Sequence, residues 1–215
     1  MKKLFDAIKK NNVEIVKMLI EKNGSLVNCT ATKPPQKDDG QSPLQVAIKN
    51  RKFAIAEFLL NMGANVNFIE SENCSNNWRT PVVHDAINCA IMCSRFNTLT
   101  NGQIETFNSK ETAKKAYSLL KKIIELGANV NAVDSYGNSC LDRACLQASQ
   151  ILPTFNHTTQ QLCNDRLITT ELIEDLSSIF NLLIQNGADL NYKKDNKTII
   201  EKYNYLPVGK FLKIN

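Results

Sequence analysis

The chain has 215 residues, of which 43% are hydrophobic and 22% charged, which is enough for one domain or an elongated repeat array with a buried core. Its net charge of +5, with both signs interspersed, excludes a polybasic nucleic-acid-binding arm and an acidic tail. No apolar run approaches the roughly 18 residues that span a bilayer, so no membrane partner is expected.

The first residues and the cysteines both predict a cytoplasmic location. Asp6, Lys9 and Lys10 interrupt the apolar stretch of about 7–15 residues that a secretory signal needs. The seven cysteines are odd in number, and most lie in apolar or Ala-rich segments, as reduced cysteines that act as small hydrophobic residues do. The basic surplus lies in residues 1–67, where a solvated lysine-rich surface is the simpler interpretation and an acidic partner the alternative.

A repeated phrase of five residues divides the chain. Pairs of apolar residues precede its glycine at intervals of four, as Ile55/Ala56 and Leu59/Leu60 do, and this spacing is typical of a helix rather than a strand. Each glycine is therefore expected just past a helix end, in the left-handed conformation that glycine adopts without steric cost. The copies are 63–67, 127–131 and 187–191, with a weaker copy at 24–28.

A second phrase opens each unit. It covers residues 40–48 (Gly-Gln-Ser-Pro-Leu-Gln-Val-Ala-Ile), with counterparts at 80–87 and 137–145. Its Ser or Thr is predicted to cap a helix, and proline suits the first turn that follows. The alternation of the two phrases predicts paired helices that stack along the chain.

Two long insertions interrupt the third and fourth units, since successive glycines of the first phrase are 39, 64 and 60 residues apart. We expect these insertions, around residues 97–112 and 153–170, to lengthen the helices on either side of them. Because neighbouring units stack, the extensions should lie side by side as a helical lobe. The lengthened helices are expected over 86–96 and 109–126, up to Leu152, and over 169–186.

The two phrases together resemble the ankyrin repeat, in which a Thr-Pro-Leu-His-x-Ala helix and a Leu-rich helix precede a Gly-Ala-Asp-Val-Asn turn and a finger loop. The resemblance, closest to small bacterial or viral ankyrin proteins, implies an all-α solenoid that forms a single domain of residues 1–215. About four full repeats and a partial C-terminal one are expected, whereas the family's period of about 33 residues makes the insertions departures. The expected boundaries are 1–38, 39–76, 77–134, 135–194 and a cap at 195–215.

No motif predicts catalysis or a cofactor. Of the two histidines, His157 lies in a polar insertion, and the resemblance gives His84 a structural hydrogen-bonding position. Adjacent helices could bring cysteines together, but their spacing is not the Cys-x2-Cys of zinc sites, so core packing is expected and no metal. Lysine patches without aromatic neighbours do not favour nucleic-acid binding. The cysteines concerned are Cys89, Cys93, Cys140 and Cys145.

The resemblance implies that a partner protein occupies a concave groove lined by finger loops and first helices. Trp78, the single tryptophan, is the leading candidate because interface hot spots favour Trp, Tyr and Arg; the alternative is that it folds back and holds its finger to the stack. The finger loops are 34–39, 69–79, 134–136 and 193–196. The predicted contact residues are Trp78, Arg79 and Tyr136 on the fingers and Gln45, Lys49, Asp85, Asn88 and Arg143 on the helices.

The sequence therefore predicts a monomeric, non-catalytic protein-interaction module, acting as an inhibitor, an immunity factor or an effector. The alternative is a small-molecule- or metal-binding regulator that uses the inserted lobe, which a ligand pocket lined by Cys89, Cys93 and Cys145 would favour. An enzyme is the third alternative and would require a deep cleft holding His84 or a perturbed carboxylate. Fold alone does not decide among them.

Overall fold

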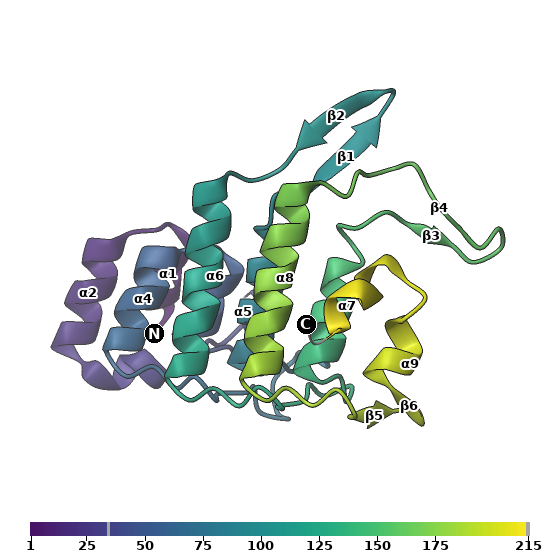
Figure 1. The fold of residues 1–215 in the computed structure, drawn as a ribbon. Coiled ribbons are helices and arrows are strands. Elements are labelled where there is room, and N and C mark those ends of the chain that lie inside the picture. Colours follow the sequence, from purple (N-terminus) through teal and green to yellow (C-terminus); the bar gives the residue numbers. More distant parts are fainter. Residues whose placement is uncertain (34, 214–215) are drawn as a thin grey trace.

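The computed structural model describes residues 1–33 and 35–213 as a stack of paired helices (Figure 1). One layer is formed by α1, α3, α5 and α7, each in contact with the next, and the other by α2, α4, α6 and α8. The helices are α1 (Lys2–Lys9), α2 (Val13–Lys22), α3 (Pro43–Lys49), α4 (Phe53–Asn61), α5 (Val82–Met92), α6 (Lys110–Glu125), α7 (Cys140–Ala148), α8 (Thr170–Gln185) and α9 (Ile199–Tyr203).

Short elements complete the described chain. Three two-stranded antiparallel sheets pair β1 with β2, β3 with β4, and β5 with β6. No helix in the described residues is long and apolar enough to cross a membrane. The strands are β1 (Asn97–Thr100), β2 (Gln103–Thr106), β3 (Phe155–Asn156), β4 (Gln161–Leu162), β5 (Lys193–Lys194) and β6 (Lys197–Thr198), and the 3-10 segments are Gly24–Asn28, Gln36–Asp38 and Pro207–Leu212.

One hydrophobic core runs the length of the stack, from Leu4 to Leu212. The apolar pairs predicted from the helical spacing are buried in it, with Ile55, Leu59 and Leu120 fully inaccessible. Burial of each such side chain contributes roughly 1.5–3 kcal/mol. The core is therefore shared between neighbouring helix pairs rather than closed within any one of them.

The glycines of the repeated phrase end helices as predicted. Gly63, Gly127 and Gly187 have φ values of 84°, 91° and 88°, which confirms the left-handed conformation there. Gly24 also lies two residues past the end of its helix, α2, but the left-handed conformation is wrong there, because Gly24 begins a 3-10 segment (Gly24–Asn28) and is not among the positive-φ residues.

The last asparagine of the phrase links each helix pair to the next. The Asn67 side chain donates to the Gly127 carbonyl at 3.0 Å and accepts from the Asn129 amide at 2.8 Å. Asn28 makes the same two bonds to Gly63 and Asn65, and Asn131 makes them to Gly187 and Asp189. These exposed bonds form a ladder, and the ladder fixes the spacing of the stack along its turn edge.

The predicted helix caps are correct at two of three positions. Ser42 and Ser139 each accept a hydrogen bond from the backbone three residues on, within full capping boxes. Thr80 does not cap α5, because this helix begins at Val82 with Pro81 in the capping position. The Thr80 hydroxyl instead lies 3.3 Å from the Asp85 carboxylate.

The insertions correct the all-α prediction. The second helices are lengthened, since α6 and α8 have 16 residues each against 9 in α4. The first helices α5 and α7, however, end at Met92 and Ala148, short of the expected Phe96 and Leu152, and hairpins β1–β2 and β3–β4 form in the breaks between the helices. Asn101 and Gly102 have φ values of 53° and 77°, so this Asn-Gly pair forms a two-residue hairpin turn rather than only ending a helix.

The two insertions do lie against each other, but as loops and strands rather than as a helical lobe (Figure 1). The Asn97 side chain exchanges two hydrogen bonds with the Leu167 backbone, at 2.9 and 2.8 Å. Beside it, the Leu99 amide donates to the Asp165 carbonyl at 2.8 Å. Pro34 in the first predicted finger and residues 214–215 of the predicted cap lie outside the described residues.

Candidate functional site: a hollow between α3, α5 and α7

A hollow of about 330 Å³ lies where α3, α5, α7 and the finger that carries Trp78 meet. It brings together four of the eight predicted contact residues, namely Lys49, Trp78, Asp85 and Asn88. We call it the concave hollow. Its lining residues are Ile48, Lys49, Arg51, Trp78, Asp85, Asn88, Cys89, Met92 and Gln147.

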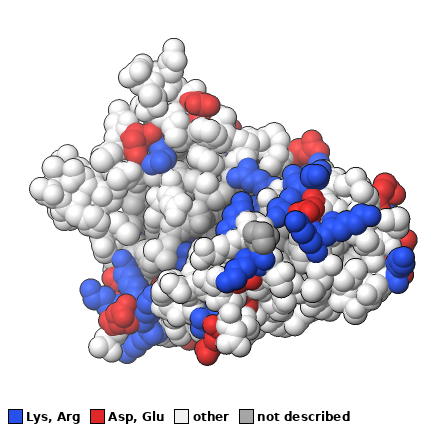
Figure 2. Space-filling model, turned by 180° about the vertical axis from the view of Figure 1, so that it is seen from behind, with Lys and Arg blue, Asp and Glu red and all other residues white. Residues whose placement is uncertain are grey.

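The view from behind shows how charge is distributed over the molecule (Figure 2). Lys and Arg side chains gather across the middle of this face, whereas the parts that project at its top and left carry few charges. A partner that approaches this face meets basic side chains over its middle and largely uncharged projections beside them.

A buried pair of carboxylates lies on either side of Lys49. The Lys49 ammonium nitrogen is 3.5 Å from Asp85 Oδ1 and 3.9 Å from Glu70 Oε1, and both acidic side chains are buried. Burial raises the pKa of Asp85 to about 7, against the opposing effect of Lys49 and with a further increase from Glu70. The concave hollow therefore contains a carboxyl group that changes charge near neutral pH.

Asn88 supplies an unsatisfied polar group to the same hollow. Its side-chain oxygen is buried and has no hydrogen-bond partner within the described part of the chain. Leaving such a group without a partner costs about 1–3 kcal/mol. A ligand group that bonded to this amide would remove that cost, which makes Asn88 a better candidate contact than a solvated surface side chain.

Trp78 is both held to the stack and accessible. Its indole nitrogen donates to Asp134 at 3.0 Å, and the Arg143 guanidinium lies 4.7 Å from the ring centroid. Arg143 also donates to Asp134 at 2.8 Å. Trp78 nevertheless remains 38% exposed, so one face of a fixed ring borders the concave hollow.

Asp134 is the centre of the network that holds Trp78. Burial alone would raise its pKa, but hydrogen bonds from Asn138, Trp78 and Arg143 hold the pKa well below its usual range. The carboxylate is therefore charged at neutral pH and orders the finger in which it lies.

The remaining predicted finger residues lie outside the concave hollow. The Arg79 amide donates to the Ser135 hydroxyl oxygen on the next finger, and the Arg79 carbonyl accepts from the Ser135 amide, both at 3.0 Å. The Arg79 guanidinium lies 3.4 Å from the Glu72 carboxylate. Tyr136 is 57% exposed. These two residues can contribute to a rim but do not line the hollow.

Gln45, also a predicted contact residue, lies inside the protein and not on the concave face. Gln45 is fully buried, its amide nitrogen donates to the Thr80 carbonyl at 2.9 Å, and its oxygen accepts from the Ser42 amide at 3.0 Å. It closes a capping box and joins α3 to the loop before α5. Arg143 is likewise used internally, since its side chain is only 12% exposed and is paired with Asp134.

His84 has the structural position that the resemblance implies. Its Nε2 lies 3.0 Å from the Ala132 carbonyl and donates to it. Burial lowers the pKa of His84 to about 4, so the ring is neutral at pH 7. The side chain is fully buried, with no exposed surface for a substrate to approach.

The cysteines form no metal site among the described residues, where no three metal-ligating side chains converge. Cys89, Cys93, Cys140 and Cys145 are buried free thiols, as expected for core residues. Cys89 lines the concave hollow. The hydrogen bond between Cys89 and Cys93 raises the pKa of the Cys89 thiol, and the burial of Cys89 raises it further.

Several residues that line the concave hollow were not predicted as contact residues. Gln147 follows Arg143 by four residues and Met92 follows Asn88 by four, so helical spacing alone could have placed both on the correct face. Arg51 carried no such signal, because it lies in the turn between α3 and α4 with a φ of 53°.

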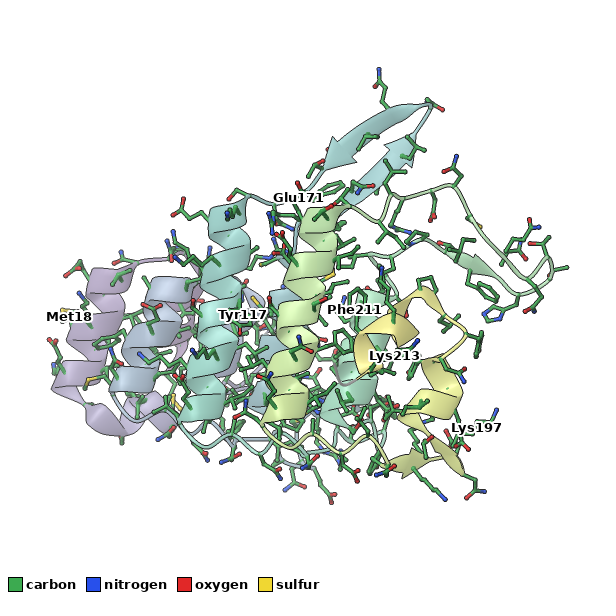
Figure 3. All side chains as sticks on the ribbon, viewed as in Figure 1. Met18, Tyr117, Glu171, Lys197, Phe211 and Lys213 are labelled. Carbon is green, nitrogen blue, oxygen red and sulfur yellow. The ribbon has the colours of Figure 1, made fainter. Side chains whose placement is uncertain are left out.

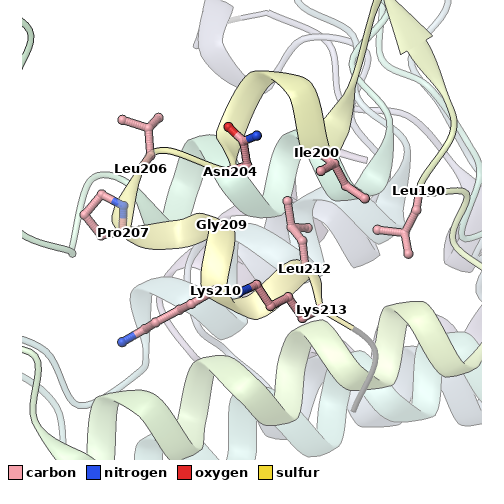
Figure 4. A pocket seen from close by; sticks show the side chains of 9 residues that line it. All are labelled: Leu190, Ile200, Asn204, Leu206, Pro207, Gly209, Lys210, Leu212 and Lys213. Carbon is pink, nitrogen blue, oxygen red and sulfur yellow. The ribbon is translucent and has the colours of Figure 1, made fainter.

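A second, more apolar hollow lies near the C-terminal end of the described chain (Figure 4). Its volume is about 490 Å³, and it contains none of the predicted contact residues. The lining is Leu190, Ile200, Asn204, Leu206, Pro207, Gly209, Lys210, Leu212 and Lys213.

Comparison with known families agrees with the helix pairs and the repeated phrases. Residues 3–70 match the family of ankyrin repeats (3 copies). No curated protein matches the chain. Ankyrin repeats are generally protein–protein interaction modules and are typically non-catalytic. Residues 3–70 are thus similar to ankyrin repeats, and the repeated phrases and stacked helix pairs continue beyond them.

Proposed function

We propose that this protein binds a partner protein through the face that contains the concave hollow, without catalysing a reaction. The observation that carries the proposal is the convergence of Lys49, Trp78, Asp85 and Asn88 around one hollow. In it, the Asn88 side-chain oxygen has no hydrogen-bond partner from residues 1–33 and 35–213. Stacked helices hold these side chains in place before binding, so little conformational entropy is lost on association.

Trp78 supports a hot spot at the edge of the hollow. Its ring is fixed by Asp134 and Arg143 and still exposes over a third of its surface. A partner side chain that covers the ring would bury apolar area at small ordering cost. Tyr136, on the next finger, is the proposed rim contact, and Arg79 the second.

The finer features of the prediction remain proposals. They are the repeat boundaries, a monomer in a cytoplasmic location, the absence of cofactor and nucleic-acid binding, and the role as an inhibitor, immunity factor or effector. The regulator alternative gains no support from the cysteines, because no metal-ligating cluster of three forms among the described residues.

The proposal is tested by photo-crosslinking with benzoylphenylalanine at Gln147 in the concave hollow. The control position is Met18, which is 50% exposed on α2 at the other end of the molecule (Figure 3). We expect a protein from native lysate to be captured from position 147 and not from position 18. Equal capture from both positions would contradict the proposal.

Affinity of the purified partner gives the second test. Asn88→Ala removes the unsatisfied amide, and we expect Kd to rise about tenfold, the value of one hydrogen bond. Asn181→Ala is the matched control, because Asn181 is an exposed asparagine on α8 in the other helix layer. An unchanged Kd for Asn88→Ala, measured by calorimetry on the folded variant, would place the contact elsewhere.

A further inference from the structure

The hairpin β1–β2 has one covered edge and one open edge. Leu99 in β1 donates its amide to the Asp165 carbonyl at 2.8 Å, and Asn97 binds the Leu167 backbone through its side chain. The segment that follows β4 therefore occupies the side of β1 that faces away from β2. Within the described residues, no element occupies the corresponding side of β2.

The register shows which backbone groups of β2 face outward. Directly opposite residues in an antiparallel pair either exchange both hydrogen bonds or neither. Leu99 pairs with Ile104 and directs its amide away from β2, so the Ile104 backbone also faces away from β1. Alternation along the strand gives Thr106 the same orientation and directs Gln103 and Glu105 toward β1.

The open edge is protected only by the shortness of β2 and by one charged side chain, Glu105. All four residues of β2 are exposed, and Ile104 is 54% exposed. Strand edges are commonly protected by lysine, proline or a bulge. The strand contains no lysine or proline and has regular pairing, and Glu105 is the single charged residue between positions 97 and 107.

We propose that the outer edge of β2 is a second docking surface, which binds an extended segment of a partner protein as an added strand with a basic residue beside Glu105. This mode of binding uses the free N–H and C=O groups of Ile104 and Thr106 for affinity. The surface shares no residue with the concave hollow, so the inference does not depend on the function proposed for that hollow.

The charge of the hairpin favours a partner segment over a second copy of this chain. A copy that added its own β2 would bring a second Glu105 and no basic side chain from residues 97–107. A basic segment would neutralise Glu105 on one face and place an apolar residue beside Ile104 on the other, since opposite faces alternate along strands.

Amide hydrogen exchange measured by NMR tests the proposal directly. The probe is the peptide acetyl-Lys-Val-Lys-Val-Lys-Val-amide at millimolar concentration, with the Glu-Val peptide of the same length as control. In the free protein, the Gln103 and Glu105 amides should exchange slowly and the Ile104 and Thr106 amides rapidly. We expect the Lys-Val peptide to slow Ile104 and Thr106 by about tenfold, the effect of one hydrogen bond each.

Proline and alanine substitutions distinguish binding through the backbone N–H group of β2 from binding through the side chain. Ile104→Pro removes an outward N–H, which edge strands tolerate, whereas Ile104→Ala removes only the side chain. The peptide should protect Thr106 in Ile104→Ala and not in Ile104→Pro. Slow exchange of Glu105 verifies that the hairpin persists, and Thr106→Pro, read at Ile104, is the second blocking variant.

Three results would overturn the proposal. One is unchanged exchange at Ile104 and Thr106 in the wild type with saturating Lys-Val peptide. Another is equal protection by the Glu-Val peptide, which would contradict the basic partner. The last is protection of both amides in the free protein that grows with protein concentration, which would assign the edge to a second copy.

Discussion

The compact region of the stack (α1–α4) and the region with insertions (α6–α8) differ in structure at one end of their helices and share the same structure at the other end. The family match covers residues 3–70 and ends before the first insertion. Beyond it, α6 and α8 are lengthened at their first turns, and hairpins occupy the space before them. The turn ends of all these helices keep the same Asn ladder, with bonds of 3.1, 3.0 and 2.9 Å to successive glycine carbonyls.

The contacts that stack the repeats therefore lie away from the positions at which the length of the repeats varies. The ladder and the paired apolar residues lie near the glycine turns, whereas the insertions leave and re-enter at the opposite ends of the helices. Each insertion can therefore change without altering the spacing of the stack. Four variant sets test this separation, from the largest expected effect to the smallest.

Truncation of a buried leucine should lower the free energy of unfolding by the same amount in both regions. Leu59→Ala in α4 and Leu119→Ala in α6 each empty a buried site, and each should lower the free energy of unfolding by about 2–5 kcal/mol. Urea denaturation followed by circular dichroism measures both. If Leu119→Ala cost much less than Leu59→Ala, the region with insertions would be packed less tightly than the comparison requires.

Removal of the Asn97–Leu167 hydrogen bonds, which join the two insertions, should destabilise the insertions more than the stacked helices. Asn97→Ala leaves the Leu167 amide and carbonyl without their partner, at a cost of about 1–3 kcal/mol. We expect faster hydrogen exchange in β1–β2 and unchanged exchange in α3 and α4. Uniformly faster exchange along the chain would show that the insertions support the whole stack.

Neighbouring residues on α5, between the two regions, should give opposite pH dependences. His84 has its pKa lowered to about 4, so its contribution to stability is present above about pH 6.5 and is lost as pH falls toward 4. Asp85 has its pKa raised to about 7, so its contribution is present below about pH 4 and is lost as pH rises through 7.

The two effects oppose each other in the wild type, and single variants should separate them. Stability of Asp85→Asn should rise between pH 4 and 6.5, by at most about 1.4 kcal/mol per pH unit. Stability of His84→Gln, which keeps a donor for the Ala132 carbonyl, should fall between pH 4 and 7. Urea midpoints at several pH values provide the measurement, and parallel profiles for the two variants would refute the assignment.

The smallest expected effect is on the ladder. Asn28→Ala in the compact region and Asn67→Ala, at the residue that bonds the turn after the lengthened helix α6, each remove two exposed hydrogen bonds, and each should cost about 1 kcal/mol. Thermal melts of both variants under one condition check the equality. A clearly larger loss for Asn67→Ala would mean that the insertion strains its junction.

Much of the fold could be predicted because its signals are local. The spacing of apolar pairs placed α4, α6 and α8, and the left-handed glycines ended them. The hairpin was missed because Asn101-Gly102, a local turn signal, was interpreted only as a break between two helices. The candidate site was predicted in part: Lys49, Asp85 and Asn88 were placed by their helix face, whereas Gln45 shared that expectation and is buried.

Helix periodicity, turn conformation and capping depend on residues a few positions apart, and for that reason the sequence by itself determined the paired helices and their order. Contacts between distant residues were decided only by the tertiary structure. Asn97 meets Leu167 across 70 positions, and Trp78 meets Asp134 across 56. Burial, which raises the pKa of Asp85, likewise depends on α3 and the loop before α5 closing over it, and no local pattern encodes that enclosure.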